Sequence, residues 1–265
     1  MAVIKIERKQ RFLINSVVLG ILMYLLSFGV IKTTFLTLLV VTGYLLFSIF
    51  VVHYPNLKIT SLAVSSILPL FLSYGVFLTL RYFPNLALVF KIITVIGYAG
   101  LYYVVSLVDN IFLVVNERKE IIPLYRVAVT WSHIMIIVIA IPFYAGVFKL
   151  PINSLLQNTI IFLTTVILCF YSIWASRYDK GMKNVSVGEG TLLSVYSAFI
   201  VSGMSTAVSF FPTEAFMRAL LVSSTLMFVM NYSITGYLKN EIYRKIIFEY
   251  LGIVLLFFLL TLIFD

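Results

Sequence analysis

Uninterrupted apolar segments recur along the whole chain, and they restrict its fold more than any other feature. Most run for about 18 residues or more, which lets a helix cross roughly 30 Å of hydrocarbon. The segments lack the alternation of apolar and polar residues that is typical of a membrane β-strand. Because every backbone polar group must be satisfied inside lipid, we expect these segments to be transmembrane helices.

The composition favours the same class of protein. Hydrophobic residues make up 62% of the chain and charged residues 11%, whereas a soluble domain has about 25% charged residues. So few charges cannot cover a surface that faces water. We therefore expect a single integral membrane domain over residues 1–265, of the all-α class.

Short polar or proline-containing breaks divide the chain into nine predicted spans. Their approximate ranges are 11–30, 34–54, 61–82, 85–116, 124–148, 152–177, 190–211, 214–237 and 243–264. Pro69 and Pro142 fall inside two of these ranges and are predicted to kink them, because proline removes a helical hydrogen bond. The expected fold is a polytopic bundle of about nine transmembrane helices.

The distribution of cations predicts the orientation of these spans. With the N-terminus in the cytoplasm, fourteen of the 19 Lys and Arg residues fall on the cytoplasmic side: Lys5, Arg8, Lys9, Arg11, Lys58, Arg118, Lys119, Arg126, Arg177, Lys180, Lys183, Lys239, Arg244 and Lys245. The other five, on the external side, are Lys32, Arg81, Lys91, Lys149 and Arg218. The positive-inside rule therefore predicts a cytoplasmic N-terminus and an external C-terminus in a plasma (inner) membrane.

The net charge of +9 is explained by this topology. Cations at the cytoplasmic ends of spans attract anionic lipid headgroups, which are the expected partners of these side chains. The charge therefore gives no reason to expect a nucleic-acid partner.

One carboxylate, Asp109, lies inside the predicted span 85–116, seven residues from its cytoplasmic end. That distance corresponds to a depth of roughly 10 Å. An ionisable residue at such a depth normally faces the interior of a bundle and has a partner there. Asp109 and His133 are each twelve residues from Ile121, so we predict that they face each other on consecutive antiparallel helices.

This predicted pair has two interpretations. The preferred one is structural, in which the pair fixes the packing of two helices. The alternative is functional, in which Asp109 and His133 relay protons or contact a substrate. The full set of candidate polar residues comprises Asp109, Asn110, His133, Thr130, Asn231 and His53. A cavity open to the cytoplasm would explain why they share one side of the membrane, and interfacial capping would explain His53 equally well.

Two further patterns concern packing and interfaces. Ala198, Ser202 and Thr206 recur at every fourth position of the span 190–211, a spacing that predicts close helix contact. Trp174, Tyr178 and the many tyrosines at the interfaces are predicted to form aromatic belts.

The sequence lacks the common motifs of enzymes. It contains no H-E-x-x-H, no G-x-x-x-x-G-K-[ST] and no G-x-S-x-G. Two histidines and scattered acids do not form a zinc or di-iron ligand set. We therefore predict no catalytic residues, no metal site and no cofactor.

The segment "DNIFLVVNERKEIIPLYRVA", residues 109–128, resembles a segment of uncharacterised multi-pass membrane proteins of bacterial candidate phyla. In these proteins an Asn-Ile-Phe helix end, a charged turn and Ile-Pro-Leu-x-Arg-x-Ala open the next helix. The resemblance covers about 20 residues and implies a similar fold. It implies no mechanism.

Three classes of function follow from these features. The first is a transporter or permease-like carrier of a small or lipidic molecule, which would use the polar residues of the cytoplasmic half. The second is an integral membrane subunit or scaffold, which would bind another membrane protein or a second copy of the chain. The third, an enzyme acting on a lipid-linked substrate, is the least favoured, because too few acids and bases converge.

Overall fold

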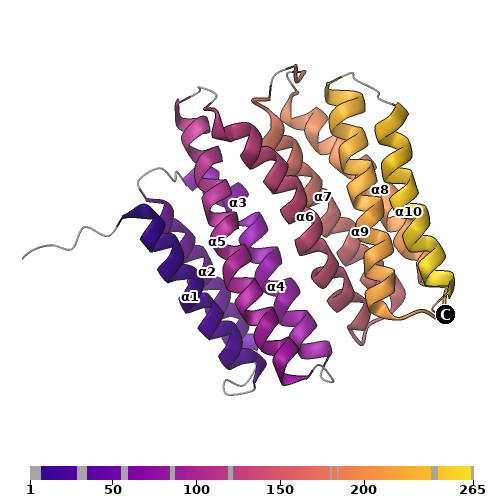
Figure 1. Cartoon of the computed structure of the whole chain (residues 1–265), viewed down its shortest axis with the longest axis horizontal. Helices are drawn as coiled ribbons and strands as arrows, with labels where there is room; N and C mark the ends of the chain where they lie inside the picture. Colours follow the sequence, from indigo (N-terminus) through magenta and orange to yellow (C-terminus); the bar gives the residue numbers. More distant parts are fainter. Residues whose placement is uncertain are drawn as a thin grey trace, which may run out of the picture. The chain divides into compact units, whose positions relative to one another are not determined.

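The computed structural model describes residues 7–28, 35–54, 59–83, 87–118, 122–179, 181–183, 185–239 and 244–263. Five of the cations used to predict the orientation lie outside these ranges: Lys5, Lys32, Lys58, Lys119 and Lys180. All regular secondary structure in the described ranges is helical (Figure 1). The all-α prediction is therefore confirmed.

The helices coincide with the predicted spans. Their bounds are α1 (Arg8–Ser27), α2 (Phe35–His53), α3 (Ile59–Ser65), α4 (Ile67–Tyr82), α5 (Leu88–Arg118), α6 (Leu124–Lys149), α7 (Ser154–Ser176), α8 (Val187–Val208), α9 (Ala215–Tyr232), the π-helix η1 (Ser233–Leu238) and α10 (Arg244–Ile263). In the described ranges, 8 of the spans are long and apolar enough to cross a membrane, and α10 contributes a shorter apolar stretch, Ile247–Ile263. The chain is a multi-pass membrane protein.

The helices form two compact units, which we call unit 1 (Met1–Trp131) and unit 2 (Ser132–Asp265). Helix α6 begins in unit 1 and continues into unit 2. Each unit is described by itself below, and the expected single domain over residues 1–265 stays a prediction.

In unit 1, α1 and α5 form the most extensive helix pair. Helix α4 packs against both of them, and α2 contacts α1 and α4. Gly20 permits the close approach of α1 to α5, since a Cβ at this position would lie only 3.2 Å from the Cβ of Ala99. Ile49 of α2 and Leu113 of α5 form a buried cluster with Leu62 of α3. Apolar packing therefore holds α5 between its neighbours.

Pro69 explains why the predicted span 61–82 is divided into α3 and α4. Proline has no N–H, so the carbonyl of Ser65, four residues earlier, loses its helical donor. The division falls at Ser66, whose backbone N–H donates to Leu62 and whose carbonyl accepts from Leu70. The predicted disruption at Pro69 is confirmed. Pro142, in contrast, lies inside the continuous helix α6.

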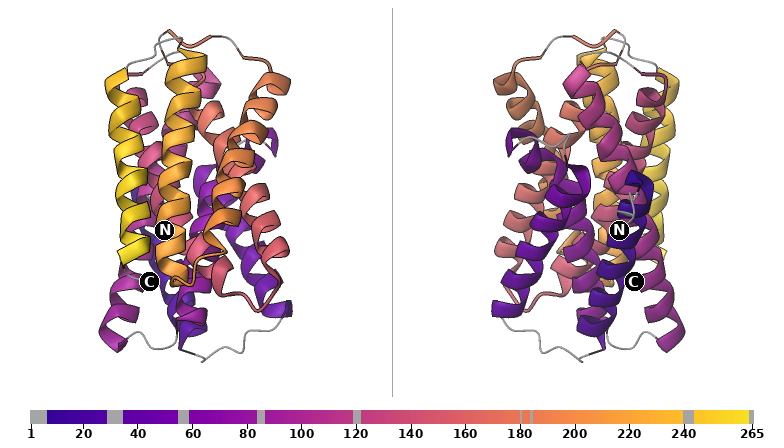
Figure 2. Two further views of the ribbon diagram at one scale, coloured as in Figure 1. Left: turned by 90° about the vertical axis from the view of Figure 1, so that its right-hand side faces the viewer. Right: turned by 90° about the vertical axis from the view of Figure 1, so that its left-hand side faces the viewer.

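In unit 2, α7 and α8 form the most extensive helix pair, and α9 packs against α8 and α10. Figure 2 shows α9 and α10 side by side. Val208, Leu221 and Val254 form a buried cluster from α8, α9 and α10. Of the small residues predicted to give close packing in span 190–211, Ala198 is fully buried in α8, whereas Ser202 is half-buried and Thr206 is exposed.

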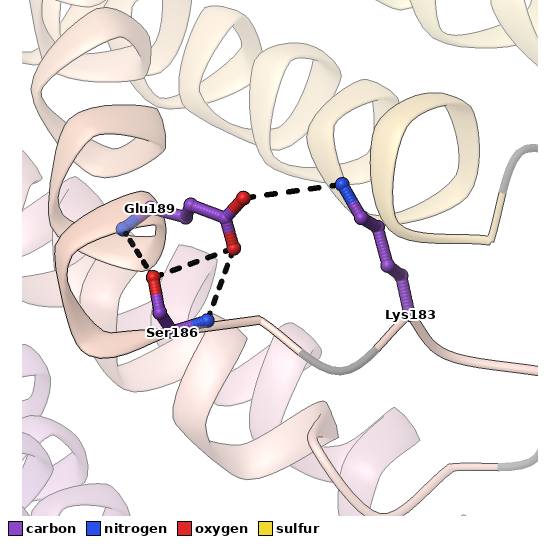
Figure 3. A network of polar contacts seen from close by, with 3 residues as sticks. All are labelled: Lys183, Ser186 and Glu189. Atoms are coloured by element: carbon purple, nitrogen blue, oxygen red, sulfur yellow. Dashed lines mark hydrogen bonds and ion pairs between the residues drawn. The ribbon is translucent and has the colours of Figure 1, made fainter.

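Two helix ends in unit 2 are fixed by side chains. Ser186 and Glu189 form a capping box at the start of α8, and Lys183 lies 3.9 Å from Glu189 (Figure 3). The amide of Gln157 donates to the carbonyl of Leu150 at 3.0 Å, just after α6 ends. These bonds satisfy backbone and side-chain groups that helix ends would otherwise leave unpaired.

Candidate functional site

A buried group of polar side chains lies inside unit 1. It consists of Asn15 on α1, Ser48 on α2, and Tyr102 and Asp109 on α5, and we call it the Asp109 cluster. The exposed fractions of these side chains are between 1% and 7%. Among the described residues Asp109 is the only buried carboxylate. An acid at this place is costly in a membrane bundle and normally has a specific role.

The side chains of the Asp109 cluster come from three helices. The Asn15 amide donates to the hydroxyl of Ser48 at 3.4 Å, a long hydrogen bond. Tyr102 and Asp109 are two helical turns apart on the buried face of α5, and they interact electrostatically. Ser106 lies between them on the same face and donates to the Tyr102 carbonyl at 2.9 Å. The cluster thus spans about two turns of α5.

The hydroxyl of Tyr102 is incompletely satisfied. Asn15 and Ser48 lie within its reach, but among the described residues no partner meets the geometry of a hydrogen bond with it. A tyrosine hydroxyl stands too far from its own backbone to bond there. Buried polar groups are normally hydrogen-bonded, so the cluster has capacity to bind one more polar group.

His53, at the end of α2, shows a similar deficiency. Its ring is 5% exposed and stacks obliquely on Phe12, with ring centroids 5.2 Å apart. Within the described parts of the chain, its Nδ1 atom has no hydrogen-bond partner. Phe12 is one turn before Asn15 on α1, so His53 lies toward the end of unit 1 where α1 begins.

Two pairs of hydroxyl groups continue the polar interior of unit 1 beyond Tyr102. The hydroxyls of Ser73 on α4 and Tyr98 on α5 are 2.9 Å apart. The hydroxyls of Thr42 on α2 and Tyr74 on α4 also form a hydrogen bond. The rings of Tyr98 and Tyr102 are neighbours, with centroids 6.0 Å apart. These pairs connect α5 with α4, and α4 with α2.

In unit 2, His133 belongs to a different polar group. Its Nε2 atom lies 3.2 Å from the hydroxyl of Ser176, the last residue of α7. His133 also interacts electrostatically with Asp179 and Lys239, which form an ion pair at 2.5 Å. Lys239 directly follows the π-helix η1, so this ion pair ties the loop after α7 to the end of η1.

Each candidate residue predicted from the sequence can now be placed. Asp109 and His53 are buried in unit 1, whereas His133 is half-buried in unit 2 and bonds to Ser176. The facing of Asp109 and His133 stays a prediction, because the two residues belong to different units. The remaining three candidates are not close-packed: Asn110 and Asn231 are half-buried and Thr130 is exposed. The side chains of Thr130 and Asn231 bond to carbonyls of their own helices.

The sequence interpretation missed Tyr98 and Tyr102, because it considered tyrosines only at the membrane interfaces. Both are 1% exposed. Their positions could have indicated that they are buried in the bundle, since they lie 10 and 14 residues into α5, far from either end. A tyrosine at an interface belongs near the end of its span.

A surface groove of about 430 Å³ between α7 and α8 is lined by hydroxyl-bearing side chains. Thr159 and Thr206 on its walls each donate to a carbonyl four residues earlier in their own helix. Asn158 donates to Thr206 at 3.1 Å and accepts from Ser205 at 2.5 Å. These bonds join α7 to α8, so the polar groups of the groove are explained by packing.

Comparison with known proteins gives no relative for this chain: no family model, curated protein or solved structure matches it. What the fold and the interior define is therefore a class. The chain is a helical multi-pass membrane protein, and unit 1 has a polar interior that contains a buried carboxylate. Any finer assignment rests on the geometry of that interior.

Proposed function

We propose that this protein is a carrier for a small solute in a prokaryotic plasma membrane, and that the Asp109 cluster is its solute site. The cluster offers a carboxylate, an amide and two hydroxyls from three helices. Such a set fits a solute that donates hydrogen bonds or carries a positive charge. The orientation follows the cation distribution, with the N-terminus in the cytoplasm.

The unsatisfied hydroxyl of Tyr102 is the observation that carries this proposal. A polar network that only holds helices together is stabilising when every member is satisfied, and a partly satisfied network is destabilising. Unit 2 also contains buried hydroxyls without a partner among the described residues, at Ser172, Thr213 and Ser223. Serine and threonine hydroxyls can rotate to bond to a nearby backbone carbonyl, whereas the Tyr102 hydroxyl cannot. A bound solute would supply the missing partner of Tyr102.

Binding to the detergent-purified protein tests the proposal. A panel of small amines, amino acids, sugars, carboxylic acids and short-chain lipids is screened for compounds that raise the unfolding temperature. A compound present at a hundredfold excess over its Kd stabilises the folded state by about 2.7 kcal/mol. We expect at least one amine, amino acid or sugar to do so, and to enter proteoliposomes that contain the protein.

Tyr102→Phe is the informative variant. It removes one hydrogen bond to the solute, about 1 kcal/mol, which corresponds to a roughly fivefold weaker affinity. Tyr144→Phe is the matched control, because Tyr144 is also fully buried but its hydroxyl already bonds to Thr165 in unit 2 at 2.7 Å. Equal affinities in the two variants, or no stabilising compound at all, would contradict the solute site. A protein that co-purifies in fixed stoichiometry would favour the subunit class instead.

A further inference from the structure

The start of α9 carries an arginine whose hydrogen-bonding groups are only partly used. Arg218, in the first turn of α9, folds back over the loop that precedes the helix, and its Nη2 atom donates to the Phe211 carbonyl at 2.7 Å. Its Nε atom is buried and has no partner among the described residues. Its Nη1 atom is unbonded within the same ranges and reaches the surface of the half-buried side chain. Two of the three guanidinium nitrogens are therefore left to bind another acceptor.

No carboxylate pairs with this guanidinium in the ranges that the structure describes. Glu214 lies four residues earlier, a spacing at which ion pairs on a helix are common. Its side chain is exposed and does not come within ion-pair distance of Arg218. The sequence has no other acid between residues 190 and 238. Within the described ranges Arg218 is thus a half-buried cation without a counter-charge, whereas buried charges are normally paired.

The open end of α9 also favours an anion. The N-cap residue is Glu214, but its side chain bonds to none of the N–H groups of the first turn. The first N–H group to bond within the helix is that of Arg218, which donates to the Glu214 carbonyl at 3.1 Å. The N–H groups before it give the helix start a positive partial charge, which favours an anion and disfavours a cation. An anion beside Arg218 would be attracted by both the guanidinium and the helix.

The Thr213 hydroxyl is a further unsatisfied group at this end of α9. Thr213 directly precedes the N-cap residue, and the contact from Arg218 to the Phe211 carbonyl closes over it. The residue is 7% exposed, and its hydroxyl has no partner among the described residues. This hydroxyl can turn to a backbone carbonyl when the site is empty and donate to an anion when the site is occupied. A guanidinium, a hydroxyl and backbone N–H groups therefore gather at one end of unit 2.

The loop before α9 is held in place and is flanked by exposed rings. The ring of Phe211 packs edge-on against Phe258 of α10, with centroids 6.3 Å apart, which fixes the carbonyl that binds Arg218. Phe210 and Phe216 are 84% and 47% exposed. Large apolar side chains beside a cation can enter the boundary between lipid headgroups and hydrocarbon.

We propose that this end of unit 2 binds a phosphate group, with Arg218 as the main contact and the Thr213 hydroxyl and the first N–H groups of α9 as further donors. Arginine is suited to this role, because its planar donors match the oxygens of a phosphate. The exposed rings favour a membrane phospholipid as the source, and inorganic phosphate offers the same oxygens. The cation distribution predicts that the site faces the external leaflet. The site lies in unit 2 and does not depend on the solute site proposed in unit 1.

Binding of three probes to the whole chain, purified in a non-ionic detergent, tests the site. The probes are short-chain phosphatidylglycerol, the diacylglycerol with the same acyl chains, and inorganic phosphate. We expect phosphatidylglycerol to bind, and diacylglycerol, which lacks the phosphate, to bind at least tenfold more weakly. Inorganic phosphate that binds with the higher affinity, in a manner that depends on Arg218, would support the site and identify free phosphate as its ligand.

Arg218→Gln removes the guanidinium and is expected to weaken the binding of phosphatidylglycerol at least tenfold, because hydrogen bonds to charged groups are the strong ones. Arg81→Gln is the matched control. Arg81 is exposed at the end of α4, where the helix dipole favours a cation, and it is predicted to lie on the same side of the membrane. Its variant should keep the affinity within twofold of wild type.

Thr213→Val tests the site with a variant that should fold. It removes a buried hydroxyl that has no partner among the described residues, so the unfolding temperature should not fall, whereas phosphatidylglycerol should bind about fivefold more weakly. Glu214→Gln removes the nearest acid and should bind this lipid at least as tightly as wild type.

Three results would overturn the proposal. The first is equal binding of phosphatidylglycerol and diacylglycerol together with no binding of inorganic phosphate. The second is wild-type affinity in assembled Arg218→Gln, or in Thr213→Val if Arg218→Gln does not assemble. The third is a loss of stability and of lipid binding in Glu214→Gln, which would identify Glu214 as the counter-charge of Arg218.

Discussion

The two units handle buried hydroxyl groups differently. In unit 2 they form isolated contacts between two helices, as in Tyr144 with Thr165 at 2.7 Å and Ser197 with Ser233 at 3.1 Å. In unit 1 two such pairs, Thr42 with Tyr74 and Ser73 with Tyr98, accompany the Tyr102 hydroxyl, which has no partner among the described residues and belongs to the cluster of the Asp109 carboxylate. An isolated pair satisfies its own donors and fixes two helices. An unsatisfied hydroxyl beside a buried carboxylate can also bind a solute, which is why the proposed solute site lies in unit 1 and a packing role is proposed for the pairs of unit 2.

The topology experiment should give the largest effect, because a cysteine on one side of the membrane either reacts with an impermeant reagent or does not. The exposed positions Glu117 at the end of α5 and Lys149 at the end of α6 are predicted to lie on opposite sides of the membrane. We expect Glu117→Cys to react with an impermeant thiol reagent only in broken cells and Lys149→Cys in intact cells, with Cys169 replaced by alanine in both. The reverse pattern would place Asp109 near the external surface.

Replacement of Asp109 should give the next largest effect. Asp109→Asn keeps the shape of the side chain but carries no negative charge, so we expect normal yield and loss of at least nine-tenths of solute uptake. Asp109→Leu removes hydrogen bonding as well, which leaves buried partners unsatisfied at about 1–3 kcal/mol. Its yield of assembled protein should fall. Full uptake by Asp109→Asn would favour a structural role for Asp109 in helix packing.

The ion pair of unit 2 should affect stability and leave transport intact. Asp179→Ala leaves Lys239, whose side chain is 26% exposed, without its 2.5 Å partner. Because both groups retain partial access to water, we expect a loss of roughly 1–2 kcal/mol in unfolding free energy. Thermal unfolding and proteoliposome uptake are measured on the same preparation. An unchanged unfolding temperature together with abolished uptake would indicate that unit 2 takes part in transport.

The contact between α7 and α8 should give the smallest effect. Asn158→Ala removes the bonds to Ser205 and Thr206, and hydrogen bonds between membrane helices contribute about 0.6 kcal/mol each. We expect a destabilisation near 1 kcal/mol. The neighbouring Thr159→Val should be nearly neutral, since the Thr159 hydroxyl bonds only within its own helix. Equal effects of the two changes would contradict a structural role for Asn158.

The positions of the helices could be predicted from the sequence because they depend on local properties. The span predicted at 124–148 is α6, Leu124–Lys149, and the disruption predicted at Pro69 is the division between α3 and α4. The length of an apolar segment determines whether that segment can span a membrane, and a proline disrupts the helix only within about one turn. The fold class therefore followed directly.

The membership of the site could not be predicted in the same way. Asn15 and Ser48 are 33 positions apart, and Ser73 and Tyr98 are 25 apart. Whether such residues meet depends on the rotation of each helix about its axis and on close approaches such as that of Gly20 to Ala99. Asp109 was recognised because a lone acid in an apolar segment is conspicuous by itself. Tyr98 and Tyr102 were not, because tyrosine is common at both interfaces and interiors.

The response of the Asp109 carboxyl group to a bound solute is the most direct measure of the central claim that unit 1 holds the solute site. Infrared difference spectroscopy, with and without a stabilising solute, follows the stretching bands of this carboxyl group. We predict a solute-induced change that is absent in Asp109→Asn, unchanged in Tyr144→Phe, and weaker in Tyr102→Phe at the same subsaturating solute concentration. A solute-induced spectrum that is the same in Asp109→Asn and in the wild type would show that the solute binds elsewhere, and would contradict the account.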